Sequence, residues 1–237
     1  MSSTAANTAA TDTAAPNPAD MPFTVPVTDR LTYHFLIAVD IEGYSKLSTA
    51  QQKQVQQDLH QILETAAAAA GLDRRTWLRQ VGGDGEMAIL PPDTDGLLVL
   101  VSYPRALAAA LAELNRERRP PIRLRVAMHH GPLSDGLFGA VGQAPIVVAR
   151  LLDSQELRDE LRADPVREMA LIVSSSLYSD IVETGFEGLA PEEFHPVEIT
   201  AKGASFPGRI HRGPRRPSPF RARPGEQVVG REGVDDL

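Results

Sequence analysis

The order of strand-like and helix-like patterns in the first third of the chain constrains its fold more than any other feature. An apolar run at 34–39 ends at Asp40 and has the length of a buried strand. Residues 48–71 then show helical spacing of apolar side chains, with a serine at the start and a glycine at the end as cap candidates. Two strand-like runs, 77–81 and 86–90, flank a Gly-Asp-Gly turn, which predicts a β-hairpin.

The remaining patterns extend this order. They predict helices at about 98–114 and 146–161 and strands at 123–129 and 170–174. The strand at 123–129 is expected to stop at Gly131 and Pro132. Short edge strands are expected at 197–200 and 208–211. The series β-α-β-β-α-β is typical of the ferredoxin-like split βαβ arrangement. We therefore expect an α+β fold with this palm-type core.

Composition divides the chain into three parts. Residues 1–22 contain almost nothing large and apolar, so they cannot offset their own ordering entropy, and we expect a disordered N-terminal segment. The stretch 213–237 is rich in Pro, Arg and Gly, which predicts a flexible tail. Residues 23–212 are enough for one domain with its own core.

Charge and apolar content argue against several classes of protein. The formal net charge of −7 predicts no stable nucleic-acid binding, because phosphate contacts need a basic surface. No apolar run approaches the roughly 20 residues of a membrane-spanning helix, so we expect no membrane insertion. The chain has no cysteine and no basic-then-apolar leader, which predicts a cytoplasmic protein without disulfides.

Asp40 at a strand end and Asp84 in the hairpin turn are the candidate metal ligands. Pairing of the first strand with the hairpin would place the two carboxylates together. Such a pair repels itself and favours a cation, and hard oxygen ligands suit Mg²⁺ or Mn²⁺. Each aspartate alone is more commonly a turn or cap residue. Together they favour a two-ion site, and backbone N–H groups of the turn at 41–45 would hold a triphosphate.

Five short motifs in this order resemble the catalytic domain of class III adenylate and guanylate cyclases. They are 38–45 (AVDIEGYS), 83–88 (GDGEMA), 125–132 (RVAMHHGP), 148–151 (VARL) and 201–203 (AKG) followed by Pro207 and Ile210, and they span about 35–211. Each motif is short, but five in the right order are fairly specific. The first two resemble the segments that carry the metal aspartates of the family.

The resemblance implies a nucleotide cyclase, which converts a nucleoside triphosphate to a 3′,5′-cyclic nucleotide and pyrophosphate. Asp40, Ile41 and Asp84 would form the metal site, with two Mg²⁺ or Mn²⁺ ions per site. Arg150 would stabilise charge on the α-phosphoryl group, and Lys202 would hold the terminal phosphates. In this family the metal residues and the arginine or lysine come from different protomers, so a homodimer with composite active sites is implied.

Gly43, Tyr44 and Gln80 are the implied substrate-binding residues, and Gln80 departs from the adenine pattern. Adenylate cyclases usually have a base-reading lysine at this position, and an asparagine where this chain has Ile146. The segment between 131 and 150 is also short. Cyclase-like proteins that make cyclic CMP or cyclic UMP in bacterial phage defence depart from that pattern too. We therefore expect UTP or CTP as the substrate and an antiviral second messenger as the product.

Two alternatives use the same residues. Ile146 cannot donate the hydrogen bond that orients the ribose, which favours a catalytically inactive cyclase-homology module for dimerisation or nucleotide sensing. Retention of both aspartates, the arginine and the lysine favours the active enzyme. A palm domain of the polymerase or diguanylate-cyclase type shares the strand order, but the segment Lys202 to Gly203 argues against it.

Four further residues receive structural interpretations. We expect His129 to be a packed or capping histidine and Trp77 to lie in the core or in a dimer interface. Glu86 is interpreted as a solvated carboxylate and Arg125 as a member of an ion pair.

Overall fold

The computed structural model of the chain describes residues 30–212, which contain one eight-stranded sheet and the helices that pack on it. The strands are β1 (Thr32–Ile41), β2 (Leu78–Val81), β3 (Gly85–Ile89), β4 (Leu124–Gly136), β5 (Gly139–Val141), β6 (Met169–Ser174), β7 (Phe194–Ala201) and β8 (Ala204–His211). The helices are α1 (Thr49–Ala69), α2 (Tyr103–Asn115), α3 (Gln143–Leu152), α4 (Gln155–Ala163) and α5 (Ser175–Asp180). The predictions for 1–22 and 213–237, and the first residues of the expected domain, lie outside the described part.

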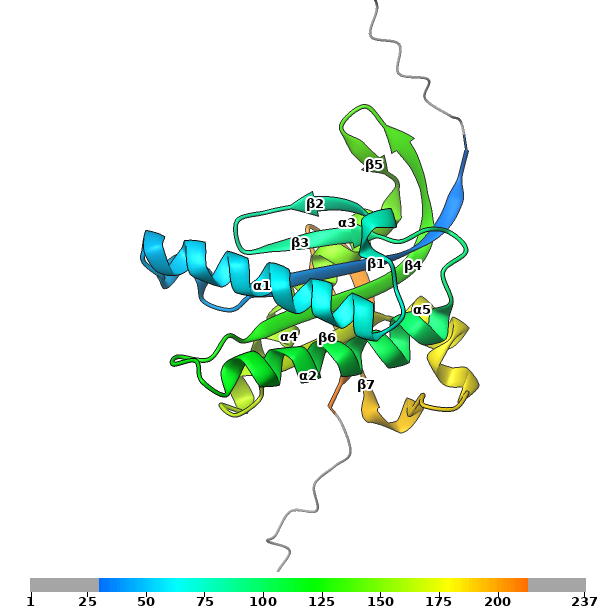
Figure 1. The fold of residues 1–237 in the computed structure, drawn as a ribbon. Coiled ribbons are helices and arrows are strands. Elements are labelled where there is room, and N and C mark those ends of the chain that lie inside the picture. The colour runs from blue at the N-terminus through cyan, green and yellow to red at the C-terminus, as the bar shows by residue number, and fades with distance from the viewer. Residues whose placement is uncertain (1–29, 213–237) are drawn as a thin grey trace, which may run out of the picture.

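The strand order of the sheet is β2-β3-β1-β4-β6-β8-β7, with β5 paired to β4 (Figure 1). Strand β1 is antiparallel to both β3 and β4, while β4 and β6 run parallel. The first six elements are therefore the predicted β-α-β-β-α-β series, wound as a ferredoxin-like core. This confirms the expected α+β fold.

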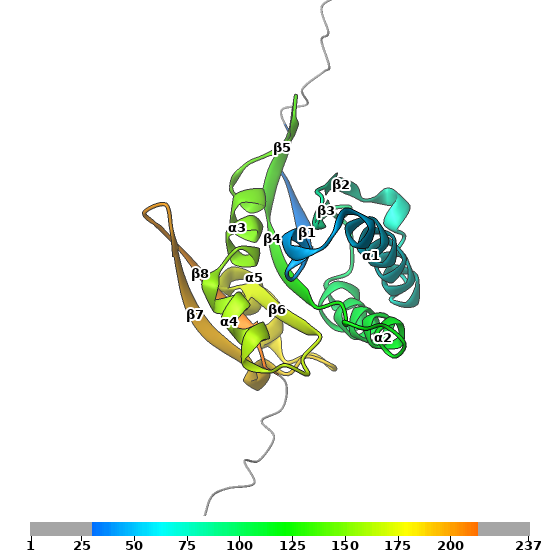
Figure 2. The same cartoon turned by 90° about the vertical axis from the view of Figure 1, so that its left-hand side faces the viewer.

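Helices cover both faces of the sheet (Figure 2). Alternate residues of β1 point to opposite faces, so Phe35, Ile37 and Val39 pack with α1 and α2. Leu36 and Ala38 pack on the other face with α3 and α4. By the same alternation Asp40, at the end of β1, belongs to the face that α3 covers.

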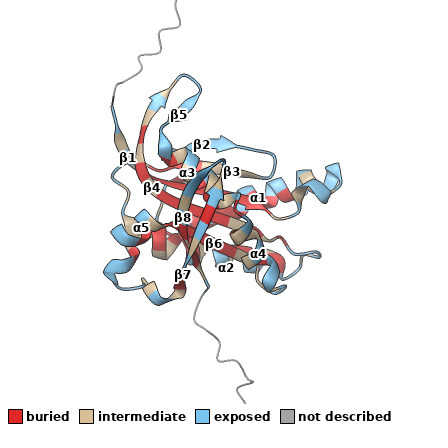
Figure 3. Ribbon diagram, turned by 180° about the vertical axis from the view of Figure 1, so that it is seen from behind, coloured by how far each residue is buried: buried red, intermediate tan, exposed pale blue. Residues whose placement is uncertain are grey.

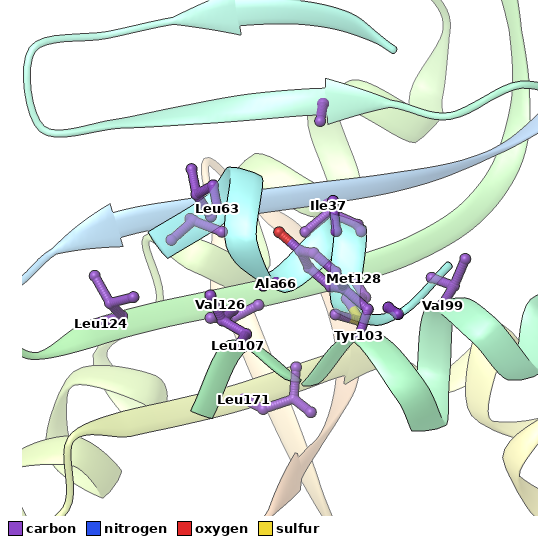
Figure 4. Close-up of a cluster of buried hydrophobic side chains, with 14 of the residues drawn as sticks. Ile37, Leu63, Ala66, Val99, Tyr103, Leu107, Leu124, Val126, Met128 and Leu171 are labelled. Atoms are coloured by element: carbon purple, nitrogen blue, oxygen red, sulfur yellow. The ribbon is translucent and has the colours of Figure 1, made fainter. Parts of the chain in front are cut away.

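The larger of the two cores lies between the sheet and helices α1 and α2. Tyr103 on α2, Leu63 on α1 and Ile37 on β1 are all fully buried there (Figure 4). The buried segments follow the central strands, whereas β2 and most of β5 are exposed (Figure 3). None of the helices within 30–212 is long and apolar enough to cross a bilayer.

Helix α1 begins where the sequence predicted. The backbone N–H of Ser48 donates to Gln51 Oε1 at 2.9 Å, and the Ser48 hydroxyl accepts from the Gln51 N–H, which together form a capping box. This cap fixes the direction in which α1 leaves the turn after β1.

Two predicted element boundaries were wrong. Strand β4 continues past Pro132 to Gly136, because β6 pairs only with 124–128 and Pro132 therefore lies on an edge that tolerates proline. The single helix expected at 146–161 is two helices, α3 and α4. It breaks at Asp153, after which Ser154 accepts a hydrogen bond from the Leu157 N–H as the N-cap of α4.

Candidate active site

Asp40 and Asp84 line the same open cavity of about 300 Å³. Strand pairing produces this proximity, because Asp40 lies opposite Gly85 in the register of β1 and β3. The Ile41 N–H also donates to the carbonyl oxygen of Asp84 at 2.9 Å, which joins the end of β1 to the hairpin turn. Residues 44 positions apart in the sequence (84 minus 40) are therefore neighbours.

Gly85 explains why a glycine must follow the hairpin aspartate. A Cβ at this position would lie 1.9 Å from the carbonyl oxygen of Val39 and 2.9 Å from Cα of Asp40. Both are backbone atoms of β1, so no side-chain movement could relieve the contact. Only glycine allows β3 to approach the end of β1 this closely.

Asp40 is buried, with 9% of its surface exposed, and forms an ion pair with Arg125 on β4. The guanidinium Nε of Arg125 donates to Oδ1 of Asp40 at 2.8 Å, and Nη2 donates to Oδ2. Burial nevertheless raises the pKa of Asp40 to about 6; Arg125 opposes this shift, and the nearby charges of Asp84 and Asp153 add to it. Arg125 thus has the ion-pair role expected of it, and its partner is a candidate metal ligand.

Asp153 is a third carboxylate at this cavity that sequence reasoning missed. It follows the last residue of α3 and lines the cavity together with Ala149 and Leu152. Arg158 donates to Oδ1 of Asp153 at 2.6 Å, which holds the side chain at the break between α3 and α4. Within 30–212, no group of three or more acidic or histidine side chains is placed to hold a metal ion. Asp153 adds to the negative charge that raises the pKa of Asp40.

Gln80 on β2 lines the same cavity. Its amide lies against the turn between β4 and β5, since a Cβ on Gly139 would be 2.6 Å from Nε2 of Gln80. Gly139 has a φ of 112°, a conformation that favours glycine. The implied base-contact residue is thus packed against a turn that offers no side chain at this point.

Gly43 and Tyr44 form the turn after β1 but do not line the cavity that holds Asp40 and Asp84. Gly43 has a φ of 73° and precedes a short 3₁₀ helix, Tyr44–Lys46. The Tyr44 ring packs against the edge of the larger core. Contact of these two residues with a substrate stays a prediction.

Arg150 and Lys202 also lie outside this cavity. Ala149 and Leu152 of α3 line it, but Arg150 between them does not, and within 30–212 the side chain of Arg150 makes no hydrogen bond or ion pair. Lys202 is exposed in the turn between β7 and β8, with a φ of 51°. This turn extends from the sheet edge opposite β2 (Figure 2). One protomer therefore does not bring the two cations to the two aspartates.

The interpretation of Glu86 as a solvated carboxylate was wrong. Its side chain is buried and pairs with Arg74 Nη2 at 2.5 Å, on the face of the hairpin that α1 covers. Arg74 also pairs with Glu64 of α1. A buried arginine between two carboxylates therefore ties the hairpin to the helix, and the partner, 12 positions before Glu86, could not be recognised from sequence spacing.

Two structural interpretations were confirmed. His129 is buried, and its Nδ1 lies 2.7 Å from the Ser174 hydroxyl, which caps α5. Burial lowers the pKa of His129 to about 4, so the ring is neutral at physiological pH. Trp77 lies in the larger core, edge-on to Tyr103.

Comparison with solved structures identifies the fold around this cavity. The chain is similar to the guanylyl cyclase Cya2 (TM-score 0.53, 13% identity, covering 77% of this chain and 91% of that one). It is also similar to an adenylate/guanylate cyclase/hydrolase from Silicibacter pomeroyi (0.52, 19%, 76% and 95%) and to the adenylyl cyclase CyaB from P. aeruginosa (0.50, 15%, 78% and 97%). No family model matches the sequence, and no curated protein matches it significantly. The chain thus has the fold of the class III nucleotide cyclase catalytic domain.

Proposed function

We propose that this chain is a nucleotide cyclase that converts a nucleoside triphosphate, with UTP or CTP preferred, to a 3′,5′-cyclic nucleotide and pyrophosphate. The observation that carries the proposal is the shared cavity of Asp40 and Asp84 in a fold common to adenylyl and guanylyl cyclases. The reaction joins the ribose 3′ oxygen to the α-phosphorus and breaks the bond to the pyrophosphate. The 3′ hydroxyl loses its proton to water, and the pyrophosphate leaves with the electron pair of the broken bond.

The two carboxylates fit Mg²⁺ or Mn²⁺. They are hard oxygen ligands in one cavity, and burial raises the pKa of Asp40 despite its ion pair with Arg125. These cations bind readily through one or two carboxylates when phosphates and water complete the coordination. When bound, two ions would lower the pKa of the ribose hydroxyl and neutralise phosphate charge. Asp40, Asp84 and the backbone of Ile41 would hold them.

Arg125 binds both carboxylate oxygens of Asp40 but does not itself line the cavity. Its Nη1 is buried and has no hydrogen-bond partner among the described residues, although Nε and Nη2 are both bound to Asp40. Arg125 would therefore fix the position of Asp40 for the metal ions without contacting the substrate itself.

The remaining cations would come from a second protomer. Arg150 and Lys202 lie outside the cavity of their own chain, so a homodimer would be needed to supply charge to the α-phosphoryl and terminal phosphates. Exposed apolar residues on the same part of the chain suit such an interface. Phe138, at the turn between β4 and β5, is 100% exposed, and Leu137 in the same turn and Val81 on β2 are also largely exposed.

Gln80, together with Ile146 and the short segment 131–150, is the basis of the proposed pyrimidine preference, because all three depart from the adenine pattern. The Gln80 amide offers both a donor and an acceptor, whereas a lysine offers donors only. Uracil and cytosine present an edge that mixes a carbonyl with an N–H or amino group, and the amide can meet it. The antiviral role of the product, the cytoplasmic location and the lack of stable nucleic-acid binding belong to the same proposal and rest on the sequence alone.

An inactive cyclase-homology module is the second candidate. Ile146 occupies the position of the family's ribose-orienting asparagine, and 43% of its surface is exposed on α3. An apolar side chain at that point cannot orient a hydroxyl group. This observation favours a module that dimerises or senses nucleotides without turnover.

A four-nucleotide assay separates the candidates. The pure protein is incubated with ATP, GTP, CTP and UTP in turn, each with Mn²⁺, and products are identified by mass spectrometry. We expect a cyclic pyrimidine nucleotide at a higher rate than cyclic AMP. A clear preference for ATP would overturn the base assignment. No product from any of the four would favour the inactive module.

We expect Mn²⁺ binding to weaken as the pH falls through about 6. The pKa of Asp40 is raised from 3.8 to about 6, so below that pH a proton must leave before the carboxylate can bind a metal ion. Affinity should be level above about pH 6.5 and fall about tenfold per pH unit below pH 6. Calorimetric titration with Mn²⁺ between about pH 5 and 8 measures this, and a flat profile would contradict it.

A further inference from the structure

We propose that Gln56 on α1 is a positioning residue that fixes the Asp84 turn relative to the turn after Asp40. Its side-chain Nε2 donates to the carbonyl oxygen of Gly83 at 2.6 Å and to the Tyr44 hydroxyl at 2.8 Å. One side chain therefore contacts both segments that adjoin the candidate metal ligands. The role rests on the proposed function, because the alignment of these turns matters for chemistry only if both carboxylates share metal ions.

The turn end of the hairpin has little other support from the helix. All four residues of β2 are exposed. A hollow of about 180 Å³ lies between α1 and the hairpin, lined by Gln56, Leu59, Leu63, Val81 and Gly82 among others. Since side chains do not fill this space, packing does not press the turn against α1. The hydrogen bond from Gln56 to Gly83 is a direct connection across it.

Tyr44 completes the connection from the other side. A Cβ on Gly83 would lie 3.6 Å from Cε1 of Tyr44, so the hairpin turn rests against the tyrosine ring. The ring packs on the core, and its hydroxyl accepts from Gln56. The Ile41 N–H also donates to the carbonyl of Asp84. The end of β1, the Tyr44 turn, α1 and the Asp84 turn thus form one closed set of contacts.

The Gln56→Met protein tests this role, because methionine keeps the length of the side chain and removes the amide. The contacts are at the surface, so we expect moderate effects of about fivefold, which corresponds to about 1 kcal/mol. The Mn²⁺ dissociation constant should rise by about this factor, measured by electron paramagnetic resonance titration. Hydrogen exchange of the Gly82 amide, which donates to Gly85 across the turn at 2.8 Å, should accelerate similarly.

Gln57→Met is the matched control. Gln57 is exposed on the same helix and its side chain makes no hydrogen bond within 30–212, so its substitution should change neither quantity. Tyr44→Phe removes one of the two contacts and should show a smaller effect than Gln56→Met. Equal exchange in Gln56→Met and the wild type, or an equal change in Gln57→Met, would overturn the role. If the wild type binds no Mn²⁺, the proposed metal site fails, while the exchange rates still test Gln56.

Discussion

The Asp84→Asn protein is expected to lose Mn²⁺-dependent turnover by roughly a thousandfold while unfolding at the temperature of the wild type. Metal ions supply several kcal/mol of transition-state stabilisation, and each 1.36 kcal/mol is a factor of ten in rate. Asp84 is exposed, and within 30–212 its side chain makes no hydrogen bond or ion pair. The substitution therefore removes a ligand without removing a structural contact. Rates and thermal unfolding curves of both proteins measure the two effects.

Asp93→Asn is the control for this experiment. Asp93 is also exposed and has no hydrogen bond or ion pair among the described residues, and it lies in the loop after β3, away from the cavity. Its substitution should leave turnover unchanged. Activity of Asp84→Asn within a few-fold of the wild type would show that the hairpin aspartate holds no ion.

Asp40 is a less informative position for the same test. Its carboxylate is the partner of the mostly buried Arg125, and removing one member of a buried ion pair leaves an uncompensated charge. Loss of activity in an Asp40 variant would therefore combine loss of a ligand with displacement of Arg125. Substitutions of the two aspartates therefore differ in their structural cost, because Asp40 ends a buried strand and Asp84 occupies an exposed turn.

The first half of the fold could be predicted because each element carried its own local pattern. The apolar run before Asp40, the cap at Ser48 and the glycines around Asp84 each specify local geometry without reference to distant residues. The end of β4 and all of β5 could not, because glycines and Pro132 interrupt the pattern there. Pairing with β1 extends β4 to Leu133, and its last three residues are held by pairing with β5.

The metal-ligand candidates were recognisable in the sequence, but their surroundings were not. Asp40 and Arg125 are 85 positions apart, and only the β1–β4 register shows that they face each other. Asp153 could not be recognised because helical residues precede and follow it. The break between α3 and α4 at this point depends on the Ser154 cap. Gln56 and Glu86 look like ordinary polar residues of a helix and a strand. Their roles depend on packing that brings α1 over the hairpin.

Mixed dimers provide the second experiment with a large expected effect. If each site combines the aspartates of one protomer with the arginine of the other, Asp84→Asn and Arg150→Ala proteins should each be inactive alone. In a 1:1 mixture that exchanges subunits, half of the dimers contain one of each variant, and one of their two sites is intact. The mixture should therefore regain about a quarter of the wild-type rate, measured by the same cyclisation assay.

The geometry of a single protomer is the reason to expect this recovery. Asp84 lies near the β2 edge of the sheet, whereas Lys202 extends from the β7 edge. Arg150 lies outside the cavity that Asp40 and Asp84 line. Lys202→Ala in place of Arg150→Ala should complement Asp84→Asn equally well, because both cations would belong to the same partner. Subunit exchange is verified independently by co-purification of two differently tagged forms. Full exchange without recovery of activity would place the aspartates and the cations in one protomer, and α3 and the β7–β8 turn would then have to move toward the cavity when substrate binds.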